Sequence, residues 1–510
     1  MKKTFSTALC VTMLFMLLSV TASAVTYSQP FPSGTVDSET FRIPALITLK
    51  NGSVLAGADI RYGHGLDSPN NNEVFIAHSK NGYADWNYKT VFYFDDYADG
   101  VTDTLSASYI DSALIQSSET GRIFMVTDAQ PSACGYLQAK QGSGFIEIDG
   151  KKHLLLTDGN NTDEIDTFDY YVGEFENGFA AVYEKDRKKT SYSVDEELNL
   201  YKDGEPLYLI QEGSEGVEIQ QNVYYNSSEL CCYCTTYLVM RYSDDNGKNW
   251  SHPINLSSLI KKESEGFLGI APGRGFVTEV NGKERILFTV YDNDGGTENV
   301  STIYSDDNGK TWNRGEETVC RKYIGKTSES QIVELNNGTL RMYARNNGKY
   351  VAYADSNDKG KSWSKFVADT QLSSVGNCMV SFINTSRTID GKKVILGSYP
   401  SSRQERADGV VRVGLVDETN KVKWISKYHI NSGFFAYSCL TELSDGNFGL
   451  LYEDQPYQIS YMVLSLSDEG ELSEINGNNI EYESDETFFE TVKRIFKTLF
   501  DKFLSLIGLL

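Results

Sequence analysis

The fold is decided by an eight-residue stretch, SDDNGKNW at positions 243–250, because the chain repeats it. It returns as SDDNGKTW at 305–312 and as SNDKGKSW at 356–363, and a degenerate fourth copy runs from Ser79 to Trp86. In the shared pattern, S-x-D-x-G-x-x-W, the aspartate bonds to the backbone of its own turn, the glycine supplies a positive φ and the tryptophan packs on neighbouring strands. The pattern predicts a tight turn between two strands.

The segments before these turns alternate over a strand's length, as in 237–242 and 300–304. The three clear copies begin 62 and 51 residues apart, and few stretches before residue 485 show a helical period. A repeat of this length, built from strands and turns, is typical of a β-propeller, in which each blade buries its faces on the next. One or two aspartates per turn are too few for a calcium cage, so we interpret the turns as structural.

The repeat is interrupted between residues 149 and 225, where charged hairpin turns such as the one at 149–152 replace the tryptophan turns. This pattern predicts a small β-rich domain inserted between two propeller segments, 25–148 and 226–480.

The two ends of the chain carry a different kind of signal. Lys2 and Lys3 precede an apolar run at 8–20 and a small-residue cleavage site, ASA at 22–24. The run is shorter than the ~20 residues of a membrane span, so we expect a signal peptide at 1–24 and a secreted, extracellular protein.

Near the other end, apolar residues recur at helical spacing opposite a charged face, which predicts an amphipathic helix at 484–510. Three roles remain open for this helix: capping the propeller core, lying on a membrane surface or pairing with a partner helix through residues 486–510.

The charge balance excludes one class of partner. The 510 residues include 47 Lys and Arg against 70 Asp and Glu, a net charge of −23. Nucleic acids are bound through clusters of basic residues, so we expect no nucleic-acid partner. An anionic ligand would require basic side chains gathered at one place.

The cysteines give little information about function. Seven remain after the signal peptide, so an odd thiol is left over, and the run at 231–234 lacks the second half of a zinc site. We interpret most of them as small buried hydrophobic residues and expect no metal or organic cofactor.

Several short segments carry residues that a bare scaffold would not require. They are FRIP at 41–44, RYGHGLD at 61–67, IDS at 110–112, FLGIAPGRG at 267–275, TSES at 327–330 and FFAYS at 434–438, with Arg345 and Arg406 between. Together with the repeated turns and the insertion, these segments resemble the bacterial exo-sialidases, the retaining neuraminidases with F-R-I-P and Asp-box motifs. The resemblance extends to about residue 470 and implies an all-β fold, a six-bladed β-propeller with an inserted small β domain.

By this resemblance, Arg42, Arg345 and Arg406 form a clamp for the carboxylate of sialic acid, with Arg403 as an open alternative to Arg406. A guanidinium suits that task because it is planar, always charged and bidentate. The clamp would also supply the local positive charge that an acidic protein needs to bind an anionic sugar. Arg61 and Asp111 would face the 4-hydroxyl and the N-acetyl group.

The resemblance further implies a catalytic set of Asp67, Glu329 and Tyr437. A neutral phenol is not repelled by the carboxylate beside the anomeric carbon, and sialidases are the tyrosine-nucleophile exception among glycosidases. Tyr437 would be the nucleophile, Glu329 its base and Asp67 the general acid. The expected activity is release of terminal α-linked sialic acid from sialylated glycans, glycoproteins or glycolipids, with retention and through a tyrosyl intermediate. Each of these side chains could instead be structural.

Thr327, two residues before Glu329, resembles the subset that performs intramolecular trans-sialylation and releases a 2,7-anhydro sugar. That subset carries a tryptophan downstream of the nucleophile, whereas here Tyr457 occupies the neighbourhood, so the product stays open. Two further hypotheses are a non-catalytic sialic-acid-binding propeller and an adhesion module that works through its C-terminal helix.

Overall fold

The computed structural model describes residues 27–62, 64–98, 105–159, 162–318, 324–374 and 376–475. Its main unit runs from Ser28 to Glu474. The expected signal peptide and the expected C-terminal helix lie outside the described residues. Within these ranges the α-helix is limited to α2 (Ser257–Ile260), and no helix is long and apolar enough to cross a bilayer.

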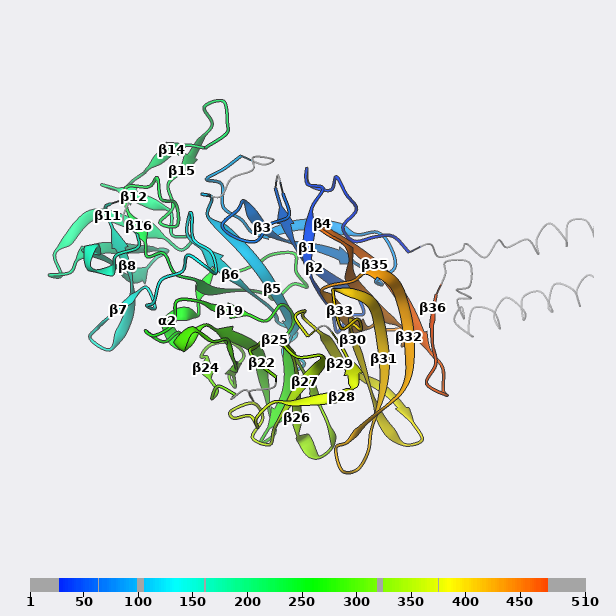
Figure 1. Ribbon diagram of the computed structural model, residues 1–510. Helices are drawn as coiled ribbons and strands as arrows, with labels where there is room; N and C mark the ends of the chain where they lie inside the picture. Colours follow the sequence, from blue (N-terminus) through cyan, green and yellow to red (C-terminus); the bar gives the residue numbers. More distant parts are fainter. Residues whose placement is uncertain are drawn as a thin grey trace, which may run out of the picture. The chain divides into compact units, whose positions relative to one another are not determined.

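Six sheets form the blades of a propeller (Figure 1), which confirms the predicted all-β, six-bladed fold. Blade 1 comprises β1 (Phe41–Thr48), β2 (Val54–Arg61), β3 (Asn72–Ser79) and β4 (Asn87–Phe92). Blade 2 comprises β5 (Ser108–Gln116), β6 (Ile123–Gln130), β17 (Tyr237–Ser243), β18 (Ile254–Asn255) and β20 (Gly273–Arg274). Blade 3 comprises β19 (Leu268–Ile270), β21 (Phe276–Val280), β22 (Lys283–Asp292), β23 (Asn299–Ser305) and β24 (Asn313–Arg314).

The other three blades are simple meanders. Blade 4 comprises β25 (Thr327–Glu334), β26 (Leu340–Asn346), β27 (Tyr350–Ser356) and β28 (Val367–Ser373). Blade 5 comprises β29 (Ser381–Ile389), β30 (Lys392–Pro400), β31 (Ala407–Val416) and β32 (Val422–Phe434). Blade 6 comprises β33 (Ser438–Glu442), β34 (Phe448–Gln455), β35 (Gln458–Leu466) and β36 (Leu472–Glu474). Blade 6 meets blade 1 through the Thr48 amide, which donates to Thr441 Oγ1 over 3.0 Å, so the ring closes.

The order of the strands explains why residues far apart in sequence meet. In an antiparallel meander, the start of the first strand, the end of the second and the start of the third lie at the same edge. Arg42, Glu329 and Tyr437 lie at the starts of first strands, Arg345 ends a second strand and Arg406 precedes a third strand. One end of the propeller therefore receives all of them.

The repeated turns have the geometry that their sequence predicts. Ser243 Oγ donates to Asp245 Oδ1 over 2.9 Å, and the same oxygen accepts the amide four residues after the aspartate over 2.8 Å. Gly247 has a φ of +84° and its amide donates to Ser243 Oγ. The turns at 305–312 and 356–363 repeat these bonds. The aspartates are thus occupied by their own turns.

The insertion forms a sheet of its own, drawn from cyan to green to one side of the blades in Figure 1. It comprises β7 (Phe145–Ile148), β8 (Lys151–Thr157), β9 (Tyr170–Glu176), β10 (Phe179–Glu184), β11 (Lys189–Asp195), β12 (Leu200–Lys202), β13 (Glu205–Pro206) and β16 (Cys231–Cys232). The hairpin of β14 (Tyr208–Ile210) and β15 (Glu218–Gln220) stands beside it. Three 3₁₀ turns, at Ile165–Thr167, Asp294–Gly296 and Asn336–Gly338, complete the described elements.

The bounds of the insertion differ from the expected 149–225. Blade 2 breaks off at Gln130 and resumes at Tyr237, since β6 pairs with β17. The charged turn at 149–152, which suggested a boundary, joins β7 to β8 inside the inserted sheet. The sequence signal was a hairpin turn, and such a turn does not tell which sheet its strands belong to.

The inserted sheet is anchored firmly to the propeller. One hydrophobic cluster includes Val182 and Val194 of the insertion together with Leu114 and Met125 of blade 2. The guanidinium of Arg241, on β17, also holds both carboxylate oxygens of Glu197 at 3.0 and 2.6 Å.

The six cysteines among the described residues, at 134, 231, 232, 234, 378 and 439, are all buried and unpaired. This agrees with their interpretation as small core residues.

Candidate functional site

Irregularities in the first strands of three blades aim polar residues at the propeller axis. The register of β1 shifts between Arg42 and Ala45, that of β5 shifts around Asp111, and that of β25 shifts just after Thr327, next to Glu329. Such bulges re-aim a side chain and are frequent beside active sites.

Two of these positions have a backbone conformation that side chains rarely adopt. Ile43 has a φ of +60° and Asp111 a φ of +58°. A β-branched residue such as isoleucine is strained there. The Ile43 amide donates to the Glu453 carboxylate over 3.1 Å, so a buried acid from blade 6 holds this conformation in place.

Tyr437, Glu329 and Arg345 form a closed triangle of hydrogen bonds. The Tyr437 hydroxyl donates to Glu329 Oε1 over 2.5 Å. Arg345 Nη1 donates to both Glu329 Oε2 and the Tyr437 oxygen, each over 2.8 Å. The structure therefore brings together a phenol, a carboxylate and a guanidinium that come from two blades.

Two more arginines flank the same phenol ring. The guanidinium carbons of Arg42 and Arg406 each lie 5.5 Å from the centre of the Tyr437 ring. Arg403 lies elsewhere, donating to Ser373 Oγ over 2.7 Å and to the Tyr350 hydroxyl over 3.0 Å. Arg406, and not Arg403, is thus the arginine that converges with Arg42.

Each of the three arginines, Arg42, Arg345 and Arg406, is held by an acceptor that belongs to none of the sequence motifs. Asn377 receives Arg345 Nε and Nη2 on its side-chain oxygen, at 3.1 and 2.6 Å, and Arg406 Nε on its carbonyl at 3.1 Å. Glu453 receives Arg42 Nε at 3.1 Å, and its side chain is only 1% exposed. These partners set the directions of the remaining guanidinium hydrogens.

Asp67 lies across this group in the loop after β2, with a side chain that is 71% exposed. Its Oδ1 accepts from Arg61 Nη1 over 2.6 Å and from Arg42 Nη1 over 3.2 Å. Partial loss of water around the carboxyl group would raise the pKa of Asp67, but the charges of Arg61 and Arg42 outweigh this and hold that pKa below its ordinary value. In the free protein Asp67 is therefore a carboxylate.

Arg61 is the one predicted binding residue that does not reach open space. Its side chain is fully buried and donates to Asp59 Oδ2 over 3.0 Å and to the Gly65 carbonyl over 2.9 Å, besides Asp67. In this arrangement it anchors the loop of Asp67, and a direct contact with a sugar hydroxyl would require it to move.

The remaining predicted residue, Asp111, lines the pocket. Burial and the nearby carboxylates of Asp59 and Asp128 raise the pKa of Asp111 well above its ordinary value. A neutral carboxyl group can donate as well as accept a hydrogen bond. For the same kind of reason, burial first and the Glu329 charge second, the pKa of Tyr437 is raised well above its ordinary value despite the arginines.

A pocket of about 200 Å³ opens over these groups. Its lining includes Ile43, Asp67, Ser68, Ile110, Asp111, Asp128, Gln130, Tyr136, Phe267, Tyr291, Glu298, Ser328, Glu329, Arg345 and Tyr437. One wall is aromatic: Tyr136 contacts Phe267 with ring centres 4.7 Å apart, and Phe267 contacts Tyr291 at 5.1 Å. The pocket thus joins a charged side to an apolar side, as a ligand with a carboxylate and an acyl group requires.

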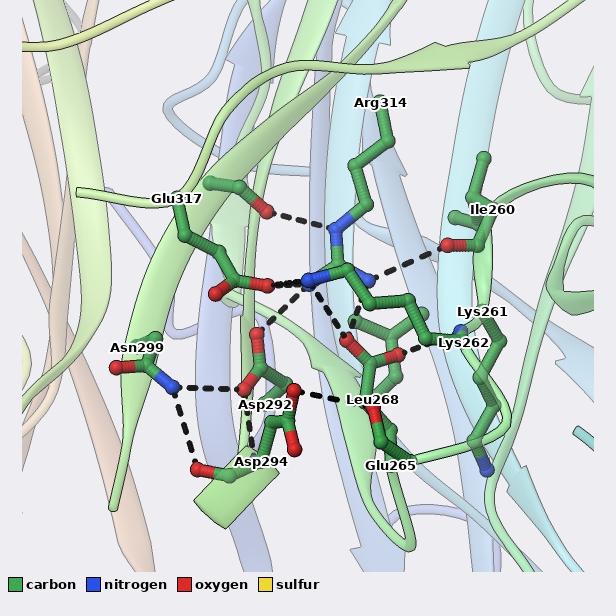
Figure 2. A network of polar contacts seen from close by, with 12 residues as sticks. Ile260, Lys261, Lys262, Glu265, Leu268, Asp292, Asp294, Asn299, Arg314 and Glu317 are labelled. Carbon is green, nitrogen blue, oxygen red and sulfur yellow. Dashed lines mark hydrogen bonds and ion pairs between the residues drawn. The ribbon is translucent and has the colours of Figure 1, made fainter. Parts of the chain in front are cut away.

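A network of charged residues in blade 3 supports the rim of this pocket (Figure 2). Carboxylate oxygens of Glu265, Asp292 and Glu317 lie within 4.8 Å of one another, a spacing that could hold a cation. The guanidinium of Arg314 takes that place, with 2.7 Å to Glu265 and 2.7 Å to Asp292. We therefore interpret the cluster as an ion-pair network.

The same network fixes the segment that carries Glu298. Asp292 accepts the Asp294 amide over 2.9 Å and the Asn299 side chain over 3.1 Å, both drawn in Figure 2. Glu298, between them, accepts from the Tyr136 hydroxyl over 3.2 Å. Tyr136 lies in residues 131–144, the stem that joins β6 to the inserted sheet, so this stem contributes to the pocket.

Comparison with known proteins agrees with the geometry. The family model of the BNR repeat-like domain matches residues 43–453. The anhydrosialidase of Macrobdella decora is 34% identical over 453 residues, which are 82% of this chain and 58% of that protein. The chain belongs to the BNR-repeat sialidase family.

Two further members of this family show a comparable similarity. Sialidase B of Streptococcus pneumoniae is 30% identical, over 84% of this chain and 64% of that protein. The solved intramolecular trans-sialidase of Ruminococcus gnavus is 33% identical with a TM-score of 0.76, covering 90% of this chain and 98% of that one. The chain thus spans about 58% and 64% of the two curated relatives' lengths.

Sequence reasoning missed the residues that support the family's motif residues. Asn377 and Glu453 hold the clamp, and Glu298 and Tyr136 shape the rim. None of them stands in a recognisable pattern; Glu453 follows a run of largely apolar residues in β34 but is itself followed by Asp454 and Gln455, so its role could not be read from the sequence.

Proposed function

We propose that the protein is a retaining exo-sialidase that removes terminal α-linked sialic acid from glycans, glycoproteins or glycolipids. The observation that carries the proposal is the 2.5 Å hydrogen bond from the Tyr437 hydroxyl to Glu329 beneath converging arginines. A catalytically silent lectin would not need a buried phenol paired with a base.

In the proposed complex the sugar carboxylate lies among Arg42, Arg345 and Arg406. Each of these arginines is already oriented by Glu453 or Asn377, so little side-chain entropy is lost when the ligand binds. Hydrogen bonds to charged groups are worth about 1.5–3 kcal/mol each, which makes the clamp the main source of affinity. The raised pKa of Asp111 favours its neutral form, which would donate a hydrogen bond to a polar substituent of the ring.

The first chemical step would form a bond between the Tyr437 oxygen and the anomeric carbon. The phenol proton passes to Glu329, which already accepts it in a hydrogen bond. The glycosidic bond breaks, and its oxygen takes a proton from Asp67. Because the pKa of Tyr437 is raised in the free protein, the phenol stays neutral until its proton is transferred during attack.

Asp67 must gain a proton before it can serve as this acid. In the free protein Arg42 Nη1 donates to Asp67, which favours its ionised form. A sugar carboxylate bound to Arg42 would compensate that positive charge and add a negative one nearby. Both changes raise the pKa of Asp67, so substrate binding itself would prepare the acid.

In the second step Asp67, now ionised, would take a proton from water, whose oxygen attacks the anomeric carbon. The bond to Tyr437 breaks and Glu329 returns its proton to the phenolate. Two displacements at one carbon retain its configuration.

A second product is supported by one specific feature. The ring of Tyr457 packs so closely on Gly65 that a Cβ added there would fall 1.8 Å from the ring. Tyr457 thus stands beside the loop of Asp67, where a bulky residue could press the glycerol side chain of the sugar toward the anomeric carbon. Relatives named anhydrosialidase and intramolecular trans-sialidase favour the same alternative, in which a sugar hydroxyl replaces water and 2,7-anhydro sialic acid is released.

The experiment is to incubate the protein with a fluorogenic sialoside and with sialyllactose and to record the NMR spectrum of the released sugar. Free sialic acid supports hydrolysis, and the anhydro sugar supports the second product. Binding of the sialoside without any turnover would refute the enzyme and leave a lectin.

We also propose, from the sequence pattern of its ends, that the protein is exported and that residues 486–510 contact a membrane surface or a partner helix. N-terminal sequencing of the protein from the culture medium tests the first point. Vesicle sedimentation with and without these residues tests the second.

A further inference from the structure

A second hollow, of about 710 Å³, lies on the inserted sheet and is not part of the site described above. It covers the solvent-facing side of β8, β9, β10 and β11. The opposite side of the same strands carries fully buried residues such as Val182 and Val194, which belong to the core. A sheet with one buried face usually covers its other face with long polar side chains.

Here the floor is made of small residues instead. Ala181 and Ser193 are paired across β10 and β11, and Gly173 lies on β9. A Cβ on Gly173 would come within 2.7 Å of the Tyr183 ring and 3.0 Å of the Ala181 carbonyl. Glycine at this position lets the Tyr183 ring lie across the sheet, so the shape of the hollow requires a residue without a side chain here.

Two aromatic rings form a platform along one side of the floor. Tyr171 and Tyr183 are paired across β9 and β10, with ring centres 5.5 Å apart and planes inclined by 17°. Phe179, at the other end, is 46% exposed. Tyr171 is only 6% exposed, so Tyr183 is the ring that a ligand can reach, with Tyr171 packed against it. Within the described part of the chain, the Tyr183 hydroxyl makes no hydrogen bond.

A histidine contributes a polar group to the same hollow. The His153 side chain is only 9% exposed, and its Nδ1 lies 2.9 Å from the Val172 carbonyl. A carbonyl only accepts, so Nδ1 carries the hydrogen and Nε2 of the neutral ring is an acceptor. Nε2 is 3.9 Å from Glu174, which is beyond hydrogen-bond distance, so its lone pair is available.

The charges around the hollow cancel. Lys151 pairs with Glu174 over 3.0 Å, and Asp149 pairs with Arg187 over 3.1 Å. Among the described residues, the lining leaves one charge of each sign without an ion-pair partner, Lys189 and Glu176. A charged ligand would find no net complementary charge, unlike the arginine-rich pocket on the propeller axis.

We propose that this groove binds a neutral oligosaccharide. A pyranose ring has an apolar face that stacks on a tyrosine ring, and its hydroxyls need both donors and acceptors around them. The Tyr183 ring, which is backed by Tyr171, offers this combination together with the acceptor of His153 and the paired charges at the rim. The inference goes beyond the proposed hydrolysis, because the groove would recognise the neutral part of a glycan and perform no reaction.

The test is titration of the full-length protein with N-acetyllactosamine, followed by ligand-observed NMR and calorimetry. This neutral disaccharide lacks the carboxylate that the arginine clamp binds, so the result does not depend on whether the protein cleaves sialosides. We expect saturable binding in the millimolar range. Absence of saturable binding would overturn the proposal, and so would binding of an acidic oligosaccharide or a peptide in place of the neutral sugar.

Variants locate the binding site. Tyr183→Ala should weaken binding by at least about tenfold, equivalent to about 1.4 kcal/mol, because the platform is lost. Ser191→Phe, which fills the groove from an exposed position on β11, should do the same without altering the core. Tyr208→Ala removes a tyrosine that is 54% exposed outside the groove and should bind as the wild type does. Equal affinity in all three variants would show that the sugar binds elsewhere and would refute the groove.

Discussion

The two hollows of this protein differ in size and in the way that the fold assembles their residues. The axial pocket measures about 200 Å³ and the groove on the inserted sheet about 710 Å³, yet it is the smaller one that holds the hydrogen-bonded pair of Tyr437 and Glu329. The pocket takes its residues from separate blades, whereas the groove is made by neighbouring strands. Size therefore says little about chemistry, and the convergence of charged groups says much more.

They also differ in how far their polar groups are already committed. In the pocket, Tyr437 bonds to Glu329, and Arg345 holds both of them and Asn377. In the groove, the Tyr183 hydroxyl has no partner among the described residues. Fixed partners suit a reaction that requires one geometry, while a free hydroxyl suits a surface that adapts to a flexible sugar.

The largest effect is expected at the nucleophile. Tyr437→Phe removes the attacking oxygen while retaining the ring, so turnover should fall by about 10³-fold or more. Sialoside binding should persist because the arginines remain, and N-acetyllactosamine binding should not change. Kinetics with a fluorogenic sialoside and calorimetry check this. Wild-type rates in the variant would remove Tyr437 from the mechanism.

Next in size is the loss of the acid. Asp67→Asn cannot protonate the leaving oxygen, so cleavage of sialyllactose should slow by about 10²–10³-fold. A sialoside with a nitrophenol leaving group needs little protonation and should lose much less. Equal losses on both substrates would contradict the acid role.

The lowered pKa of Asp67 in the free protein also predicts a pH effect. The acid must be protonated, and kcat/KM reports the free protein whereas kcat reports the complex. As pH rises, kcat/KM should decline first and kcat at a higher pH, because a bound carboxylate would raise the pKa of Asp67. Superimposed declines would refute activation by substrate binding.

A smaller effect is expected in the clamp. Arg345→Ala should raise KM by an amount equivalent to about 1.5–3 kcal/mol, with some loss of kcat because Tyr437 and Glu329 lose their shared donor. Arg403→Ala is the matched control, since Arg403 bonds to Ser373 and Tyr350 away from the pocket. If the control loses more activity than Arg345→Ala, the assignment of the clamp is wrong.

The smallest effect concerns the pH dependence of stability at the junction between the propeller and the insertion. Burial raises the pKa of Asp96 to about 6, and its carboxylate accepts from Ser132, in the stem of the insertion, over 3.0 Å. An acid with a raised pKa binds its proton more tightly in the folded state, so this stabilisation is complete below pH about 4 and lost as pH rises through about 6. The loss should be of order 2 kcal/mol.

Urea unfolding at pH 4.5 and 7.5 measures this dependence. Asp96→Asn, which does not titrate, should flatten it, whereas Asp95→Asn, at an exposed neighbour, should not. A dependence that is unchanged in Asp96→Asn would show that another group is responsible.

Sequence patterns reveal the parts of this structure that repeat or react. The repeated turns predicted the blades because their serine, aspartate and glycine bond locally, within eight residues. Family motifs pointed to Arg42, Glu329 and Tyr437, which the structure brings together. Nothing in the segment around Arg61 indicates that its side chain is fully buried.

The parts of the site and fold that the sequence does not reveal depend on contacts between distant segments. Asn377 supports two arginines, and Glu453 meets Arg42 across 411 positions of sequence, so neither has a local signature. The true limits of the insertion were hidden because β6 and β17 look like any other strands until their pairing is known.

That pairing bears on how the protein acquires its structure. Blade 2 receives its next strand, β17, only after residues 131–236 have been laid down, and closing so long a loop costs chain entropy before any contact repays it. The inserted sheet brings Gln130 and Tyr237 to adjacent positions and so shortens the effective loop. Folding of the insertion would then limit the rate at which the propeller ring closes. A destabilising substitution in the core of the insertion would therefore also disturb the distant arginines around the pocket.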